Sequence, residues 1–258
     1  MLADSHCHLD RLDLTPFDNQ FDKAIEAAHQ NGVEHFLCVA INAENQQEVI
    51  KIAESYPNIH ASVGIHPLYT KGESASIQSL AKVATHPKVV AIGETGLDYF
   101  YDVESKKQQL SLFRTHVQAA VEVGLPLIIH TRDARQDTLD ILREEGAEKV
   151  GGVLHCFTES LEMAESAMQM GFYVSFSGIV TFNNATELRE VASKIPSDRI
   201  LVETDSPYLT PKPFRGKPNS PMYVSEVAKL LAELRGTKYE DFCRTTTDNY
   251  LRLFNISH

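Results

Sequence analysis

The sequence predicts an α/β fold, and specifically a single (β/α)8 TIM barrel, from three observations. Short apolar and β-branched runs alternate with longer amphipathic segments along the whole chain. Several of the short runs are continuously hydrophobic, which is typical of parallel strands covered by helices on both faces. About eight such runs in 258 residues match the usual size of this barrel. No Gly/Ser-rich linker or charge block divides the chain, so we expect one domain over residues 1–258.

The strand candidates are bounded by turn residues and by the amphipathic segments. Parallel pairing of consecutive strands through right-handed crossovers is the arrangement that this alternation favours. An open doubly wound sheet is the alternative, but no Gly-x-Gly-x-x-Gly follows the first strand, which weakens its dinucleotide-binding version. The expected strands are approximately 2–5, 33–40, 60–65, 88–94, 125–130, 152–156, 172–176 and 200–204.

Helices are predicted in the gaps between these strands. The clearest covers 105–123, where apolar residues such as Leu110, Phe113 and Val117 recur at three- and four-residue steps and Gly124 can cap the end. A helix over 16–31 is predicted with Pro16 near its first turn. The other expected helices are approximately 44–55, 75–85, 134–145, 159–170, 184–194, 220–235 and 238–253.

Composition limits the classes of protein to consider. The chain is 43% hydrophobic and 23% charged, and no apolar run approaches the roughly 20 residues of a membrane span. The N-terminus lacks a secretory signal, and the four cysteines are scattered, so a cytoplasmic protein without membrane association is expected. The net charge of −11 argues against bulk attraction to nucleic acid, although a nucleic-acid substrate remains possible. Nothing in the sequence indicates a protein partner.

Potential metal ligands follow the predicted strands. His6 and His8 come after the first strand, and they can reach one ion because residues two apart in an extended backbone point to the same side. In a (β/α)8 barrel the carboxyl ends of all strands meet at one face, where active sites are built. The remaining candidates are placed at the ends of the fourth, fifth, sixth and eighth strands: Glu94, His130, His155 and Asp205.

Six such ligands exceed the three protein ligands that one catalytic ion typically takes. The set therefore predicts two divalent metal ions, with Glu94 bridging between an ion near His6 and His8 and an ion held by His130 and His155. Zn²⁺, Mn²⁺, Co²⁺ or Fe²⁺ suit the mixed imidazole and carboxylate donors. Paired ions activate water for hydrolysis, and Asp205 is predicted to orient that water and accept its proton, so Asp205 and Glu94 are the predicted catalytic residues.

Three further residues are candidates for substrate contact at the same face. His66 ends the predicted third strand, Arg132 follows His130, and Arg215 lies in a basic loop after the eighth strand. Phosphate contact would use the two arginines, while ordinary solvated loops explain them almost as well. The aromatic run 99–101 after Glu94 admits two interpretations, stacking on a nucleobase or packing over the barrel rim.

With these residues in place, the chain resembles the TatD family of metal-dependent deoxyribonucleases, within the amidohydrolase-like barrels. The motifs that carry the resemblance run in order along nearly the whole chain. They are Asp4-Ser5-His6-Cys7-His8-Leu9-Asp10, Gly64-Ile65-His66-Pro67, Gly93-Glu94-Thr95-Gly96-Leu97-Asp98-Tyr99, Ile129-His130-Thr131-Arg132-Asp133-Ala134, Leu154-His155-Cys156-Phe157, Ser175-Phe176-Ser177-Gly178, Glu203-Thr204-Asp205-Ser206-Pro207-Tyr208 and Arg215-Gly216-Lys217-Pro218-Asn219.

The resemblance implies a metal-dependent deoxyribonuclease that cleaves phosphodiester bonds in single-stranded DNA ends as a 3′-5′ exonuclease, with a metal-activated water and Mg²⁺ or Mn²⁺ as cofactor, while the donor types also suit Zn²⁺. It also implies that His6, His8, Glu94, His130, His155 and Asp205 hold the metal. An alternative is a two-metal esterase, such as a D-aminoacyl-tRNA deacylase, because activated water serves both reactions. A barrel that binds metal or a partner without turnover is the third hypothesis.

Overall fold

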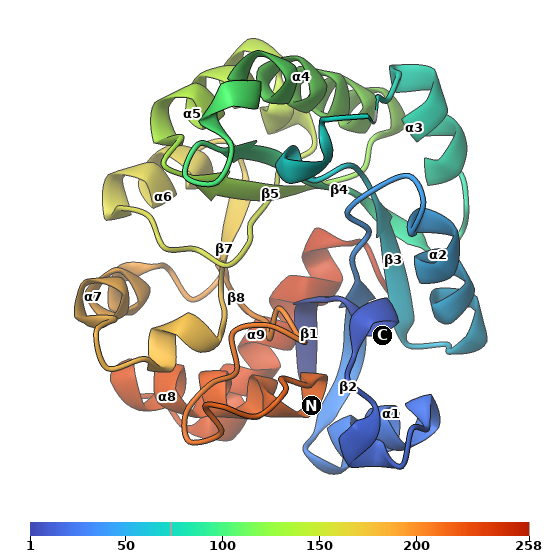
Figure 1. Cartoon of the computed structure of the whole chain (residues 1–258). Coiled ribbons are helices and arrows are strands. Elements are labelled where there is room, and N and C mark those ends of the chain that lie inside the picture. Colours follow the sequence, from blue (N-terminus) through green and yellow to red (C-terminus); the bar gives the residue numbers. More distant parts are fainter. Residues whose placement is uncertain (73, 258) are drawn as a thin grey trace.

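Eight parallel strands form one sheet that curls into a barrel surrounded by helices (Figure 1). The computed structural model describes residues 1–72 and 74–257. Each strand pairs in parallel with the next one along the chain, from β1 to β8. The strands are β1 Leu2–Cys7, β2 Val33–Cys38, β3 Ile59–Val63, β4 Val89–Asp98, β5 Leu127–Arg132, β6 Gly152–Leu154, β7 Phe172–Phe176 and β8 Ile200–Val202.

The helices follow the strands in the alternation that the sequence predicts, and the predicted (β/α)8 fold is confirmed. They are α1 Phe21–Gln30, α2 Gln46–Ser55, α3 Ile77–Ala84, α4 Lys106–Val123, α5 Arg135–Glu144, α6 Leu161–Met168, α7 Thr186–Lys194, α8 Val224–Leu234 and α9 Tyr239–Leu253. Short 3-10 turns include Leu9–Arg11 after β1 and Pro67–Tyr69 after β3. Among the described residues, no helix combines the length and apolarity that crossing a membrane requires.

The ring closes where the first and last strands meet. β1 and β8 are in contact, and the backbone N–H of Asp205 donates to the carbonyl of His6 at 2.9 Å. The N–H of His8 likewise donates to the carbonyl of Ser206 at 2.8 Å. These bonds tie the chain just after β8 to the end of β1, so residues about 200 positions apart share one side of the barrel mouth.

Two apolar cores follow from the alternation of side chains along each strand. Leu127, Ile129 and Leu154 pack between the strands and the helices. Ile128, Val153 and Leu201 belong to a separate cluster that also contains residues of α9, and this cluster fills the barrel interior. Asn249 of α9 donates to the carbonyls of Ser197 and Ile200 at the start of β8, so α9 covers the amino-terminal end of the barrel.

Several predicted boundaries differ from the structure, and two of the differences have identifiable reasons. The helix expected over 16–31 is instead a 3-10 turn at Thr15–Phe17 followed by α1, because Asp18 and Asn19 adopt the left-handed conformation at φ 55° and 56°. The strand expected to end at Glu94 continues to Asp98 and pairs with β5 along its whole extension. Gly96 permits this pairing, since a Cβ there would lie 1.9 Å from the carbonyl oxygen of His130.

Candidate metal centre

Polar side chains form the layer of the barrel interior directly above its apolar filling. His130, His155 and Glu203 each lie two residues beyond an interior apolar residue of the same strand, at positions 128, 153 and 201. A step of two residues along an extended chain keeps the side chain on the same face and moves it toward the carboxyl end. The interior therefore changes from hydrocarbon to imidazole and carboxylate within one layer, at the face where barrel active sites are built.

Glu94 occupies the middle of this layer on β4 and is 3% exposed. Its two carboxylate oxygens face side chains from four other parts of the barrel. Oε1 lies 2.8 Å from His155 Nε2, 3.2 Å from His130 Nδ1 and 3.3 Å from His66 Nε2, and Oε2 lies 3.4 Å from His6 Nε2. Glu94 therefore lies between the histidines, and its role as a bridge between two ions stays a prediction.

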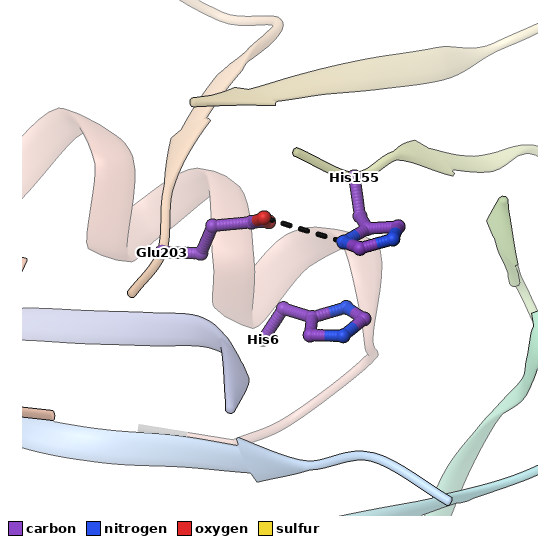
Figure 2. Close-up of side chains that lie close together, drawn as sticks. All are labelled: His6, His155 and Glu203. Atoms are coloured by element: carbon purple, nitrogen blue, oxygen red, sulfur yellow. Dashed lines mark hydrogen bonds and ion pairs between the residues drawn. The ribbon is translucent and has the colours of Figure 1, made fainter. Parts of the chain in front are cut away.

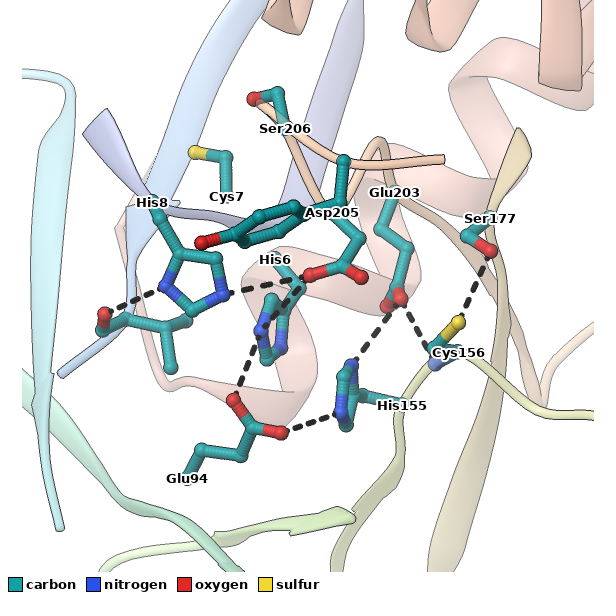
Figure 3. A network of polar contacts seen from close by, with 12 residues as sticks. His6, Cys7, His8, Glu94, His155, Cys156, Ser177, Glu203, Asp205 and Ser206 are labelled. Atoms are coloured by element: carbon teal, nitrogen blue, oxygen red, sulfur yellow. Dashed lines mark hydrogen bonds and ion pairs between the residues drawn. The ribbon is translucent and has the colours of Figure 1, made fainter. Parts of the chain in front are cut away.

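His6, His8 and Asp205 make up a second group, on the β1 and β8 side (Figure 3). Asp205 Oδ1 lies 3.4 Å from His8 Nε2 and 3.8 Å from His6 Nε2. His8 Nδ1 lies 3.1 Å from the carbonyl of Val39, which can only accept a hydrogen bond, so Nδ1 carries the proton. The lone pair of His8 Nε2 is thereby directed toward the group and is available to a metal.

Glu203, which is not among the predicted site residues, completes a third cluster with His6 and His155 (Figure 2). Its Oε1 accepts from His155 Nδ1 at 3.3 Å and from the backbone N–H of Cys156 at 2.7 Å. The carboxylate thus fixes the ring of His155 with Nε2 toward Glu94. Glu203 could have been found from its position, since it follows interior Leu201 by two residues.

Asp98, at the end of β4, was also missed. Its Oδ2 lies 3.0 Å from His130 Nε2, while the other ring nitrogen of His130 faces Glu94. Because a carboxylate on one ring nitrogen fixes the orientation and tautomer of the imidazole, Asp98 positions His130 as Glu203 positions His155. The signal for Asp98 was hidden by the expectation that β4 ends at Glu94.

The electrostatics of the centre follow from burial and mutual attraction. Burial by itself would raise the pKa of Glu94, but the imidazoles of His155, His66 and the neighbouring histidines hold that pKa well below its ordinary value. Burial opposes ionisation of Asp205 in the same way, and His8 and His6 nevertheless lower its pKa. Both carboxylates therefore stay ionised in a buried position, which favours a bound cation.

The residues present fit a divalent metal. Among the described residues, Nδ1 of His6 and Oε2 of Glu203 are buried and have no hydrogen-bond partner, while Nε2 of His6 and Nε2 of His155 face carboxylates, with Glu94 at 3.4 and 2.8 Å. Buried polar atoms without partners are costly, so an additional ligand is expected where several of them converge. Three sets of donor atoms, each within 4.8 Å of one another, are formed by His6-His8-Asp205, His66-Glu94-His130 and His6-His155-Glu203. Imidazole and carboxylate together are typical ligands of Zn²⁺, Mn²⁺ and Fe²⁺.

All six predicted ligands converge at this face, although their places on the strands differ from the prediction. His6 lies within β1 and His8 directly after it, while Glu94 and His130 lie inside β4 and β5. His155 directly follows β6, and Asp205 comes three residues after β8, in the left-handed conformation at φ 56°. The division of ligands also differs, because His66 joins Glu94 and His130 in one donor set.

The residues predicted for substrate contact lie in different environments. His66 faces Glu94 directly and is a candidate ligand as well as a cavity-lining residue. Arg132 lines the cavity above the centre. The guanidinium of Arg215 lies 4.0 Å from the ring centroid of Phe182, and its Nη1 donates to the carbonyl of Thr210. Contact of Arg215 with substrate therefore stays a prediction.

A cavity of about 600 Å³ opens above the centre. Its wall contains Arg11, which the sequence analysis did not consider, and which lies in the 3-10 turn after His8. The proximity of Arg11 to His8 in sequence was the available signal. The side chains of Glu94, Asp205 and the histidines other than His6 reach this cavity, so a ligand entering the mouth meets the donor atoms from outside.

Fold and site together define a class: a TIM-barrel protein with candidate metal ligands at the carboxyl ends of its strands. The family described as TatD related DNase matches residues 3–255. The chain belongs to the TatD family, and its curated relatives carry names of metal-dependent hydrolases. The uncharacterized metal-dependent hydrolase YcfH of Escherichia coli K12 is 47% identical over 255 residues, which cover 99% of this chain and 96% of the relative.

Two further comparisons agree. The uncharacterized metal-dependent hydrolase YabD of Bacillus subtilis is 45% identical over 261 residues and covers 100% of both chains. The crystal structure of YJJV, a TatD homolog from Escherichia coli K12, superimposes with a TM-score of 0.91 at 31% identity, covering 99% of this chain and 98% of that one. The chain is thus a TatD-family metal-dependent hydrolase.

Proposed function

We propose that this protein is a deoxyribonuclease that removes nucleotides from single-stranded DNA ends in the 3′-5′ direction, using two divalent metal ions. The observation that carries the proposal is the combination of the carboxylate and imidazole centre with two guanidinium groups, Arg11 and Arg132, on the wall of the same cavity. Guanidinium groups match the geometry of phosphate oxygens, and a phosphodiester entering this cavity would meet them together with the donor atoms. The description of the family as TatD related DNase supports the same substrate class.

The ligand sets suggest which residues would hold the metals. His6, His8 and Asp205 suit one ion, while His66 and His130 suit the other, and Glu94 lies between them. Bound divalent ions would supply Lewis-acid polarisation of the phosphate and a lower pKa for the attacking water. His155 contributes Nε2 beside Glu94, held in orientation by Glu203.

The protein's own groups would then perform three tasks. Arg11 and Arg132 bind the non-bridging phosphate oxygens and orient the phosphodiester. Asp205, whose pKa is lowered by His8 against the effect of burial, is ionised and accepts the proton of the attacking water at its carboxylate. Glu94 keeps the surrounding histidines in place through its short contacts.

The test is cleavage of single-stranded DNA labelled at either end, in Mg²⁺ or Mn²⁺. A strand labelled at its 5′ end should yield a ladder of progressively shorter products, and a strand labelled at its 3′ end should release the labelled nucleotide first. Asp205→Asn should lower the rate by about 100- to 10,000-fold, the usual contribution of a general base. Asp198→Asn is the matched control, because Asp198 is exposed before β8, at the opposite end of that strand.

Two outcomes would overturn the proposal. One is an intact DNA strand after incubation with the metal-loaded wild-type protein. The other is equal cleavage by the wild type and Asp205→Asn, which would point to a contaminating nuclease. Hydrolysis of aminoacyl-tRNA in place of DNA, in the same buffer, would assign the centre to carboxylic esters instead.

A further inference from the structure

Exposed apolar side chains gather at the barrel mouth. Seven large apolar side chains are exposed among the described residues, and five of them line the metal cavity or the cavity beside it. Phe100 and Tyr101, in the loop after β4, are 58% and 63% exposed. Apolar groups concentrated at one place on a surface mark a binding site more often than scattered ones do. The five are Leu68, Phe100, Tyr101, Val103 and Tyr208.

The aromatic run 99–101 divides into one packed and two exposed rings. Tyr99 is partly buried against the core, and its hydroxyl donates to Asp137 at 2.6 Å. Phe100 and Tyr101 contact each other edge to face, with ring centroids 4.9 Å apart and planes at 88°. Packing over the rim therefore accounts for Tyr99, but it leaves the other two rings unexplained.

Arg132 connects these two rings to the metal cavity. Its guanidinium carbon lies 4.2 Å from the centroid of Phe100 and 4.6 Å from that of Tyr101. Arg132 also lines the cavity above the metal centre. A guanidinium held against aromatic faces is oriented by cation-π attraction, so the rings and the phosphate-binding group form one unit.

A second cavity of about 640 Å³ lies beside the first. Leu68 and Tyr101 line both cavities, so the two are neighbours at the same rim. The second cavity contains Phe100 and Val103, with two carboxylates, Asp102 and Glu104, and one ammonium, Lys71. Lys71 Nζ lies 3.1 Å from Asp102 Oδ2, which neutralises one of those carboxylates.

The charges in the two cavities select different parts of a nucleotide. The first cavity presents Arg11 and Arg132 beside three carboxylates, Glu94, Asp98 and Asp205, and it suits a phosphate when the proposed cations are bound there. The second holds Asp102 and Glu104 with Lys71 and has no proposed cation, so it repels phosphate, and its partly exposed Phe100 and Tyr101 side chains suit a neutral planar group. A nucleobase is such a group, and its separation from its own phosphate by a sugar fits two cavities that share a wall.

We propose that Phe100 and Tyr101 form a stacking platform for the nucleobase next to the scissile phosphate, and that this platform selects unpaired nucleic-acid ends. The inference rests on the proposed nuclease function and adds a specificity-determining site to it. A base within a duplex is already stacked on both faces and must be unstacked before it can reach a protein ring. Stacking on aromatic side chains tolerates any base sequence, so the platform discriminates by strandedness.

A single tryptophan provides a direct test, because the chain contains none. Phe100→Trp keeps an aromatic face at the platform and adds a fluorophore. In an Asp205→Asn background, which slows cleavage by about 100- to 10,000-fold, we expect oligothymidylate to quench this fluorescence and an abasic chain of the same length to leave it unchanged. Leu234→Trp, on α8 and 37% exposed, is the matched control and should respond to neither. Equal responses to the oligothymidylate and the abasic chain would overturn the platform.

Removal of the rings gives the second test. The variant Phe100→Ala with Tyr101→Ala should bind oligothymidylate about 5- to 100-fold more weakly by fluorescence anisotropy, the range expected for the loss of base stacking. Its affinity for the abasic chain should change much less. If the variant binds both as the parent does, while the wild type cleaves DNA, the platform is wrong and the nuclease function stands. If the wild type cleaves no DNA, the nuclease function itself fails.

Discussion

Buried polar groups differ in how completely they are hydrogen-bonded in two regions of this molecule, the barrel mouth and the layer between α4 and the sheet. At the mouth, among the described residues, Nδ1 of His6 and Oε2 of Glu203 have no hydrogen-bond partner, and Nε2 of His6 and of His155 face carboxylates, with Glu94 at 3.4 and 2.8 Å. In the layer beneath α4, His116 is also fully buried, but its Nδ1–H donates to the carbonyl of Leu112 at 2.8 Å and its Nε2 accepts from the N–H of Ile65 at 3.0 Å. Nearby Gln109 likewise bonds through both its oxygen and its nitrogen.

The contrast separates binding residues from structural ones. A buried polar atom without a partner costs about 1–3 kcal/mol, so several together are retained where a ligand supplies the missing interactions. His116 needs no such ligand, because the backbone of α4 and of the segment after β3 satisfies it. Residue type alone does not distinguish His6 from His116. What distinguishes the mouth is the convergence of such atoms with carboxylates, since Nδ1 of His60 on β3, outside the cavity, also lacks a hydrogen bond among the described residues.

The largest effect is expected from Glu94→Gln, which removes the charge at the middle of the mouth. Carboxylates that only orient a metal ligand contribute about 10- to 100-fold to metal affinity, and a carboxylate among the donor atoms should contribute at least about 100-fold. We expect Mn²⁺ binding to weaken by at least that factor and hydrolysis to fall with it. Metal content after dialysis and Mn²⁺ titration measure the effect.

Glu145→Gln is a suitable control for that variant. Glu145 is paired with Arg114 between α4 and the end of α5, away from the donor atoms. Its substitution should leave the metal content unchanged. Retention of full Mn²⁺ affinity by Glu94→Gln would remove Glu94 from the ligand set and with it the contrast between the two regions.

In the layer between α4 and the sheet, titration of His116 should make the stability of the protein depend on pH. Burial lowers the pKa of His116 from 6.5 to about 4, so the folded protein holds the neutral ring. The unfolded chain takes up the proton near pH 6.5, which means that stability is undiminished above that pH and declines as the pH falls toward about 4. The decline attributable to this residue is about 3 kcal/mol.

Urea unfolding across this pH range, with a chelator present, measures the effect. His116→Gln cannot titrate, and it should be less stable than the wild type at neutral pH but lose less stability on acidification. The site histidines titrate in both proteins and cancel in the difference. Parallel pH profiles for the two proteins would show that His116 is not the titrating group.

The sequence predicted the barrel and the convergence of its ligands because both depend on short-range pattern. Strand ends can be recognised from apolar runs, and the barrel places all of them at one face. Asp98 and Arg11 were missed for different reasons. Asp98 lies on a strand extension that Gly96 makes possible, and Arg11 lies in a turn whose direction depends on tertiary contacts.

The sequence also did not predict which histidines share a set of donor atoms. Whether His66 faces Glu94 depends on the segment after β3, which His116 of α4 holds by its bond to Ile65. Likewise, the separation of Phe100 and Tyr101 from Tyr99 depends on which ring finds Asp137 and which find Arg132. These contacts join residues that are far apart in the sequence, and they distinguish between side chains of the same chemical type. The periodicity of apolar residues does not predict such contacts.

Glu203 has one carboxylate oxygen with hydrogen-bond partners and one without. A substitution at this residue therefore tests the comparison within a single side chain. Its Oε1 is satisfied by His155 and the N–H of Cys156, while its Oε2 makes no hydrogen bond. In Glu203→Gln the amide oxygen can still accept from the backbone, so folding should change little. Metal affinity should fall by about 10- to 100-fold, as for other carboxylates that orient a ligating histidine.

Leu201→Ala is the matched variant, two residues earlier on the same strand and in the apolar interior. Truncating a buried leucine should lower the free energy of unfolding of the metal-free protein by about 2–5 kcal/mol, while Mn²⁺ affinity stays close to that of the wild type. Glu203→Gln should therefore change mainly metal affinity and Leu201→Ala mainly stability, although the two residues are only two positions apart. If both variants lost stability and metal affinity in the same proportion, the polar and apolar layers would form one cooperative structure, and unsatisfied buried atoms would cease to identify the binding residues.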